Sequence, residues 1–494
     1  MDSALIFSSY IYIVFFLPIV FIGYFALSRI KNKDFQLLWL LAASLFFYSW
    51  WDIKYLPILL ISIFINFQIG KLLSKLFTKK KPILFIGITF NLLLLLYFKH
   101  FDFFIENYNG LFSQKISSLN LIIPLGISFF TFQQIAFLVD VYTNKTSDYK
   151  FLHYATYVSF FPQLIAGPIV HHKDLMPQFD DLSKRNINLR NISLGLFIFS
   201  IGLFKKVVIA DSLGGFVTSG YSSTLLISTI EAWALSLSYT FQLYFDFSGY
   251  ADMAIGSALL VNIRLPINFN SPYKAKNIQE FWRRWHMTLS HFLRDYIYIP
   301  LGGNRLSYFI TYKNILFTFI LGGIWHGAGW TFIFWGGLHG FALIILSLWR
   351  KIGWKIPMVL SWFITFNFVN IAWVFFRADN FNAAINIIGA MFGITQKSIP
   401  LDYIDSMSIL IGIPLLPYVP NFSTNAIFPS YLFLYLLILM LFVLFASNIN
   451  KAYQSPNQAS TISYTKLILG VLAFSISIIF LGMSSSQVFL YYNF

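Results

Sequence analysis

Apolar runs long enough to cross a lipid bilayer fill most of this 494-residue chain. A membrane-spanning helix needs about 20 consecutive apolar residues. The chain is 57% hydrophobic and only 11% charged, whereas soluble domains carry about 25% charged residues. Because the hydrocarbon layer offers no water to backbone groups, only helices or closed barrels span it. The sequence therefore predicts an all-α polytopic membrane protein with a single membrane domain, residues 1–494.

The apolar runs indicate roughly 11 to 13 transmembrane or re-entrant helices. The first run, 4–27, lacks a basic leader and a small-residue cleavage site, so we expect a retained span and not a cleaved signal peptide. The run 152–170 contains Pro162, Gly167 and Pro168. These residues break helices, so we expect a broken or re-entrant segment that lines an enclosed cavity. The other predicted spans, some bent or doubled, are 36–50, 54–72, 82–98, 118–143, 190–213, 224–258, 314–347, 356–377, 426–447 and 464–483.

Basic loops indicate the orientation of the chain. Lys and Arg accumulate in cytoplasmic loops, and the first span is followed by "RIKNK" while the third is followed by "KLLSKLFTKKK". This pattern predicts that the N-terminus lies outside the cytoplasm. The polar, mildly basic segment before the last span predicts the same for the C-terminus. The net charge of +15 follows mainly from this topology, and an anionic substrate at the membrane surface is a compatible second cause.

A basic amphipathic helix is predicted from residue 277 to about residue 296. Asn277 and Glu280 have capping-box spacing, and apolar residues then recur at helical intervals. Such a helix is suited to lie at the membrane surface. His286 lies at the edge of the apolar face and is expected to point inward, whereas His291 lies on the polar face and is expected to be solvated. The polar face consists of Arg283, Arg284, Ser290, His291 and Arg294.

The segment "ILGGIWHGAGWTFIFWGGLHG", residues 320–340, combines strong hydrophobicity with two histidines and seven glycines. An ionisable side chain inside a membrane helix is costly and indicates function. A neutral imidazole at His326 is suited to act as a general base; a structural histidine bonded to a carbonyl is the alternative. The glycines either allow close helix packing or leave room for a long substrate. The residues predicted to line such a tunnel are Trp325, Gly322, Gly323, Gly327, Gly329 and Asp246.

Three acidic residues, Glu231, Asp246 and Asp252, fall in apolar surroundings. Acids in such positions form proton or ion paths in transporters, or they orient a histidine or pair with a basic side chain. The alternative function is therefore a membrane transporter of acyl groups or small anions, with Asp246, Asp252 and the histidines as its coupling path.

Cysteine is absent, so the chain forms no disulfide and has no cysteine nucleophile, and the thiol of any thioester must belong to the substrate. Motifs of nucleotide-binding and zinc enzymes are also missing from the sequence, and we expect no metal site and no bound cofactor. His326 and His339 lie 13 residues apart, a spacing found in haem helices. His286 and His291 do not form a matching pair, so haem is not expected.

Four segments occur in an order that resembles the membrane-bound O-acyltransferase family: "YFDFSGYADMAIG", "NFNSPY", "FWRRWHMTLSHFLRDYIYIPLGG" and "GGIWHGAGWTFIFWGGLHG". The chain is most similar to the bacterial branch that O-acetylates polysaccharides such as alginate or peptidoglycan, strongly over about residues 120–345. The resemblance implies a ring of helices around a thin central region with a through tunnel. It also implies an inner-membrane enzyme in which His326 and His286 act on an acyl thioester, acetyl-CoA.

The resemblance further implies how the donor and the acceptor bind. The last six residues, "FLYYNF", belong to a C-terminal aromatic tail, 484–494, similar to that of acetylating members, in which the third-position tyrosine is Tyr491. We expect Tyr491 to pass acetyl to a periplasmic SGNH-type partner that modifies the polysaccharide; an interfacial aromatic belt is the alternative. No nucleic-acid partner is expected. The basic residues expected to bind the CoA phosphates are Arg283, Arg284, Arg294, Lys274, Lys276 and Arg305.

Overall fold

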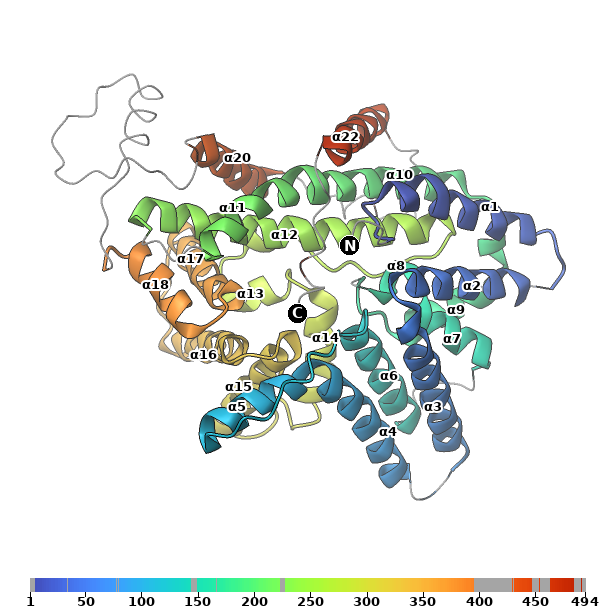
Figure 1. Cartoon of the computed structure of the whole chain (residues 1–494), viewed down its shortest axis with the longest axis horizontal. Helices are drawn as coiled ribbons and strands as arrows, with labels where there is room; N and C mark the ends of the chain where they lie inside the picture. Colours follow the sequence, from blue (N-terminus) through green and yellow to red (C-terminus); the bar gives the residue numbers. More distant parts are fainter. Residues whose placement is uncertain are drawn as a thin grey trace.

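The computed structural model describes residues 5–32, 34–76, 78, 80–143, 149–165, 167–222, 227–394, 429, 431–446, 453, 463–483 and 490. Every regular element in these ranges is a helix, which confirms the predicted all-α class. The helices form a broad, flat array in which α12, Thr229–Leu260, crosses the middle (Figure 1). In this view α10, α11, α20, α22 and α1 lie on one side of α12, and the fan formed by α2–α7 and α13–α16 lies on the other (Figure 1).

The elements follow the chain in four groups. The first group consists of η1 Ile11–Phe16, α1 Leu17–Leu27, α2 Asp34–Trp51, η2 Ile53–Tyr55, α3 Leu56–Lys75, α4 Lys80–Leu95, η3 Leu96–His100 and α5 Phe101–Phe112. The second consists of α6 Ile127–Tyr142, α7 Phe151–Ser159, α8 Phe161–Leu164, α9 His172–Asp180 and η4 Leu182–Arg185. The third consists of α10 Leu189–Phe204, η5 Lys205–Ala210, α11 Asp211–Ser222 and α12. The fourth consists of η6 Pro272–Lys274, α13 Ile278–Trp282, α14 Met287–Leu293, η7 Arg294–Tyr298, α15 Tyr308–His326, α16 Trp330–Ile352, α17 Met358–Arg377, α18 Phe381–Met391, α20 Tyr431–Phe445 and α22 Tyr464–Met483.

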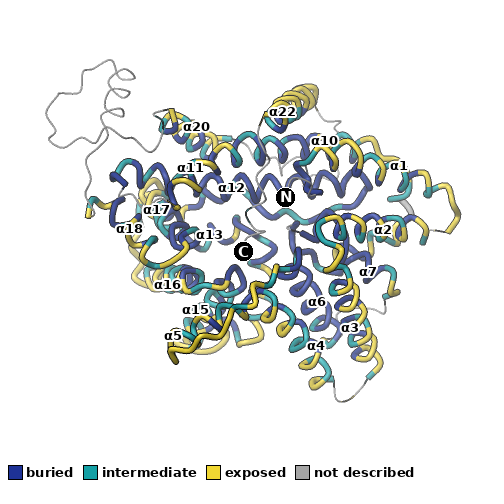
Figure 2. The backbone as a smooth tube through the Cα atoms, in the orientation of Figure 1, coloured by how far each residue is buried: buried dark blue, intermediate teal, exposed yellow. Residues whose placement is uncertain are grey.

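Six helical stretches of the described residues are long and apolar enough to cross a membrane. They are Ile53–Lys75, Lys80–Phe112, Leu189–Ser222, Trp330–Ile352, Met358–Arg377 and Tyr464–Met483. Four shorter apolar stretches, Ile11–Leu27, Ile127–Tyr142, Phe381–Met391 and Tyr431–Phe445, accompany them. The chain is thus a multi-pass membrane protein. Its exposed large apolar side chains lie on the outer helices, which Figure 2 shows in yellow, and suit contact with lipid.

The long central helix α12 begins at a capping box. The Ser228 hydroxyl accepts from the N–H of Glu231, and Glu231 Oε2 accepts from the N–H of Ser228 at 2.9 Å. The buried Glu231 therefore serves as a helix cap. Almost every later residue of α12 is buried, so the helix runs through the core rather than along a lipid face (Figure 2).

Close packing of α10 against α12 depends on four glycines, two on each helix and seven residues apart, namely Gly195, Gly202, Gly249 and Gly256. A Cβ atom on Gly249 would lie 2.7 Å from the carbonyl oxygen of Gly202, and one on Gly256 would lie 2.7 Å from that of Gly195. Without side chains at these positions, the two backbones approach closely.

Two of the predicted segments differ from the structure, and a third is divided as expected. The span predicted at 118–143 is helical only from Ile127, because Gly126 takes a left-handed conformation with φ +67°. The run 314–347 forms two helices, α15 and α16, as the expectation of doubled spans allowed. The amphipathic helix predicted from 277 to 296 is wrong as a continuous element. It breaks between Trp282 and Met287, where His286 has φ +42°.

The run 152–170 is broken as predicted. The helix stops at Phe160, Pro162 opens the short α8, and residues 167–170 are not helical. Buried side chains satisfy the freed backbone groups. Ser44 accepts from the N–H of Phe161 at 3.1 Å, and Thr288 accepts from the N–H of Ile169 at 3.0 Å. Irregular backbone inside a membrane protein requires such partners.

The glycine contacts predict a stability change that can be measured. Gly249→Ala places a methyl group against the backbone of α10, so we expect the free energy of unfolding to fall by about 1–3 kcal/mol. The control is Gly215→Ala on α11, where an added Cβ meets nothing within 4 Å. Alanine there should leave stability unchanged or raise it by up to about 1 kcal/mol. Denaturant titration in detergent micelles measures both, and equal stabilities would contradict the packing account.

Candidate active site

Two histidines that are 40 residues apart in the sequence meet in the core. His326 is the last residue of α15, and His286 lies between α13 and α14. Both are buried, with exposed fractions of 3% and 0%, and their ring centroids lie 6.5 Å apart. The structure therefore brings together the two imidazoles that the sequence singled out, and it places His286 inward as predicted. His291 is exposed, also as predicted.

The protonation of His286 follows from its hydrogen bonds. Its Nδ1 lies 3.1 Å from Oδ1 of Asn268, and the same oxygen accepts from the hydroxyl of Thr288 at 2.9 Å. Because this oxygen can only accept, the neutral ring carries its proton on Nδ1 and leaves a lone pair on Nε2. Among the described residues, Nε2 of His286 has no hydrogen-bond partner. It is available to a substrate.

The hydrogen bonds around His286 extend to the broken segment. Thr288, which donates to Asn268, also accepts from the N–H of Ile169. The left-handed backbone at His286 turns the chain so that its ring faces Phe247 of α12, with the centroids 4.8 Å apart. Three separate parts of the chain therefore hold this imidazole, which is the preorganisation that a catalytic group requires.

Aromatic rings surround His326. The ring centroids of Trp325, Trp335 and Phe376 lie 4.9, 5.1 and 5.2 Å from that of the imidazole, all in edge-on arrangements. Trp325 stacks in turn on Phe132 of α6, with centroids 5.0 Å apart. These contacts restrict the rotamers of His326 and exclude water from its surroundings.

Lys99 is a component of the site that sequence analysis missed. It lies in the π-helix η3 and is buried, with 8% exposure. Its Nζ donates to the carbonyl oxygen of Trp325 at 2.6 Å and to the Ser128 hydroxyl at 3.3 Å. The Trp325 carbonyl belongs to the last turn of α15, where carbonyls lack helical partners and a cation is favourable. The predicted span 82–98 ends just before Lys99; a lysine directly after an apolar stretch is the available signal.

His339, the second histidine of the segment 320–340, is buried in a different contact. The indole N–H of Trp282 donates to its Nδ1 at 3.2 Å, and its ring lies 4.8 Å from that of Trp335. This bond ties α13 to α16. His339 thus supports the aromatic surroundings of His326, because Trp335 contacts both rings.

The glycines around His326 make close contacts. A Cβ on Gly323 would collide with the backbone of Phe332 in α16, and one on Gly327 would collide with the ring of the same residue. Gly322 and Gly329 have looser neighbours at 3.3 Å and 3.5 Å. Close packing therefore accounts for Gly323 and Gly327, whereas a role in lining a tunnel stays a prediction for this set and for Trp325.

The basic residues predicted to bind phosphates differ in whether they already have a partner within the chain. Arg284 pairs with Glu280 at 2.8 Å, Arg294 pairs with Asp295 at 2.7 Å, and Nζ of Lys274 donates to a backbone carbonyl at 2.7 Å. These three already have partners within the chain. The exposed members of the set are Arg283, Lys276, Arg305 and the paired Arg294.

The acids in apolar surroundings have basic partners. Asp252 pairs with Lys205 at 2.6 Å, and Asp246 pairs with Lys206 at 2.7 Å. Oδ2 of Asp246 also accepts from the N–H of Leu490 at 3.1 Å. Tyr491 lies outside the described residues, but the residue before it is thus held against α12.

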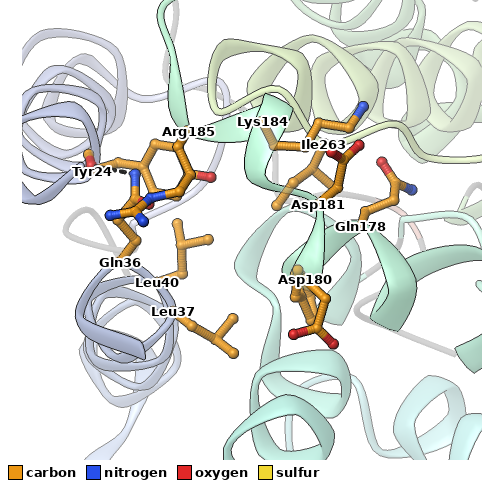
Figure 3. A pocket seen from close by; sticks show the side chains of 11 residues that line it. Tyr24, Gln36, Leu37, Leu40, Gln178, Asp180, Asp181, Lys184, Arg185 and Ile263 are labelled. Atoms are coloured by element: carbon orange, nitrogen blue, oxygen red, sulfur yellow. Dashed lines mark hydrogen bonds between the residues drawn. The ribbon is translucent and has the colours of Figure 1, made fainter. Parts of the chain in front are cut away.

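Two further features lie away from the histidine pair. Tyr296 donates to Asp140 at 3.0 Å beside His172, and burial lowers the pKa of His172 to about 4, although Asp140 opposes the shift. Figure 3 shows a pocket where Arg185 donates to Gln36 at 2.8 Å and so uses its guanidinium within the chain.

Within the described ranges, no group of three His, Cys, Asp or Glu side chains is arranged to hold a metal ion.

Comparisons with known proteins identify the family of this chain. The model of the membrane-bound O-acyltransferase family matches residues 42–384. The chain is 46% identical to the peptidoglycan O-acetyltransferase of Helicobacter pylori over 99% of this chain and 98% of that protein. It is 38% identical to a probable alginate O-acetylase of Azotobacter vinelandii over 84% of each chain. It is 27% identical to the teichoic acid D-alanyltransferase of Streptococcus thermophilus over 51% of this chain and 68% of that protein. The chain belongs to the membrane-bound O-acyltransferase family and is a multi-pass membrane acyltransferase.

Proposed function

We propose that this enzyme carries acetyl groups from cytoplasmic acetyl-CoA across the bacterial inner membrane for O-acetylation of a cell-surface polysaccharide. The observation that carries the proposal is the pair of buried imidazoles, His286 and His326, with ring centroids 6.5 Å apart and Nε2 of His286 available. The names of the relatives, which acetylate peptidoglycan or alginate, support an acetyl group and a glycan acceptor. Both termini are proposed to lie in the periplasm.

The proposed chemistry begins at the acceptor hydroxyl. His326 removes the hydroxyl proton while the oxygen attacks the thioester carbonyl, and the tetrahedral intermediate collapses with release of the CoA thiolate. The imidazolium formed at His326 then protonates that thiolate, so no proton is gained or lost. His286, held with its proton on Nδ1, presents the lone pair of Nε2 as an alternative acceptor for the same hydroxyl proton. The dry aromatic surroundings limit hydrolysis of the thioester.

The proposed first acceptor is Tyr491. Attack by its phenolic oxygen would form an acetyl ester on the tail and free CoA, and the ester would pass to a periplasmic SGNH-type partner. The hydrogen bond between Leu490 and Asp246 supports this proposal, because it holds the tail beside the helix whose Phe247 contacts His286. Of the phosphate-binding set, Arg283, Lys276 and Arg305 are the most suitable, because their side chains are exposed, whereas the exposed Arg294 is already paired with Asp295.

Labelling with radioactive acetyl-CoA tests the proposal. Purified protein should acquire acetyl label, whereas His326→Ala should slow labelling by at least about 100-fold because a general base is lost. Tyr491→Phe should abolish it because no acceptor oxygen remains. The control is His291→Ala, which changes an exposed histidine and should label normally. Full labelling of Tyr491→Phe would refute the tyrosine relay. Transport of acetyl-CoA or acetate into vesicles without any labelling would favour a transporter.

The contact of Lys99 predicts a second effect on the rate. Lys99→Met leaves the Trp325 carbonyl without its 2.6 Å donor, so the end of α15 and its imidazole are expected to shift. A misplacement of about 1 Å costs on the order of 100-fold in rate, so we expect a loss of roughly 10- to 100-fold in the labelling rate. Lys115→Met, at an exposed lysine, should behave as the unmodified protein. A normal rate in Lys99→Met would contradict the role of this contact.

A further inference from the structure

Two ion pairs, one buried and one partly buried, join α12 to the π-helix η5. Lys205 and Lys206 are consecutive in η5, and Asp252 and Asp246 lie six residues apart on α12. Nζ of Lys205 lies 2.6 Å from Asp252, and Nζ of Lys206 lies 2.7 Å from Asp246. The side chains of Lys206 and Asp246 are 2% and 1% exposed. Such pairs are costly to bury, so each needs an explanation.

The two pairs differ in what surrounds them. Lys206 contacts a second carboxylate, Asp211, at 2.6 Å, so two acids share one cation. The additional negative charge must be satisfied by other donors in a buried site. Oδ2 of Asp246 obtains such a donor from the N–H of Leu490. In the part of the chain that the structure describes, the Lys205–Asp252 pair has no bond to the tail.

The contact with Leu490 spans 244 residues of sequence and involves the backbone of the C-terminal tail. A carboxylate that accepts from a peptide N–H makes a charge-assisted bond, which is stronger than a neutral one. Because the donor is a backbone group, the bond fixes the register of the tail whatever side chain residue 490 carries. The leucine side chain packs against the buried core and adds an apolar contact.

We propose that Asp246 is a docking site for the C-terminal segment of this chain, and that Lys206 holds its carboxylate ionised and oriented toward the Leu490 N–H. Asp246 is thus a positioning residue: it acts through the tail and not on the acetyl group. Docking at Asp246 brings the tail to α12, the helix whose Phe247 contacts His286. This inference rests on the proposed relay through Tyr491. The neighbouring Lys205–Asp252 pair fastens η5 to α12 in the same way and has no docking role.

The absence of native cysteine allows a test in the full-length chain that does not depend on activity. Leu490→Cys keeps the backbone N–H and introduces one thiol, whose rate of alkylation by a maleimide reports how well the tail is docked. We expect slow alkylation with Asp246 intact and at least a tenfold increase in Asp246→Asn. The matched control, Asp252→Asn, changes the neighbouring pair and should leave the rate unchanged.

Each outcome decides the proposal. If the thiol of Leu490→Cys is alkylated no faster with Asp246→Asn than with the natural aspartate, the proposal is overturned. Equal acceleration of alkylation by Asp252→Asn would overturn it as well. If Asp246→Asn does not give a monodisperse protein, the combined replacement Lys206→Met, Asp246→Leu and Asp211→Asn removes the shared cation together with both of its acids and should show the same acceleration.

The acetyl-labelling assay separates this inference from the function on which it rests. In the chain with its natural Leu490, Asp246→Asn should lower the rate of labelling at least tenfold while the KM for acetyl-CoA stays the same, because the donor site is untouched. Accelerated alkylation together with normal labelling of Tyr491→Phe would mean that the docking site is real and the tyrosine relay is wrong. Unchanged alkylation together with loss of labelling in Tyr491→Phe would mean the reverse.

Discussion

The structure depends on how an apolar protein supplies partners for the few charges that it buries. In a medium of low dielectric constant, an unpartnered ammonium or carboxylate is prohibitively costly. Glu231 caps its own helix, and the other buried charges described above have partners on another helix. Lys206 bridges two carboxylates, Lys205 meets Asp252, and Lys99 donates to the carbonyl of Trp325. Because these bonds join segments that are distant in sequence, the same contacts that satisfy the charges also fix the helices around α12.

Breaks in the helices position the functional groups. An imidazole in mid-helix is held only by the packing of that face, whereas one at a helix end can be oriented by the turn itself. His326 ends α15, and His286 lies in a left-handed turn between α13 and α14. The broken run near Phe160 contributes the Ile169 N–H, which joins Thr288 and the bonds that hold His286. Irregular backbone is tolerated in a membrane only where such buried partners exist. Side chains of the site satisfy the broken backbone, and the breaks in turn orient the side chains of the site.

Much of the helical arrangement could be predicted from the sequence, because apolar length and helix-breaking residues are local properties. The prolines and glycine of the run 152–170 predict its break. His286 does point inward as predicted, although the helix on which that prediction rested is interrupted at this residue. What could not be predicted depends on contacts between distant residues. The left-handed turn at His286, the partner of Lys99 and the pairing of Asp246 with Lys206 follow from packing, which leaves no periodic pattern in the chain. The aromatic tail is identified only by resemblance.

A tail carried on the same chain changes what its docking site must achieve. A separate peptide would have to offset the loss of its translational freedom from binding energy alone. A segment tethered through α22 instead returns to its site at an effective concentration in the millimolar range. A docking site built on one charge-assisted hydrogen bond and one apolar side chain is then sufficient to hold the tail. Such a site would also be weak enough to release the tail on each cycle, which the proposed carrier role requires, because the tail would accept a group in the core and deliver it to a partner outside.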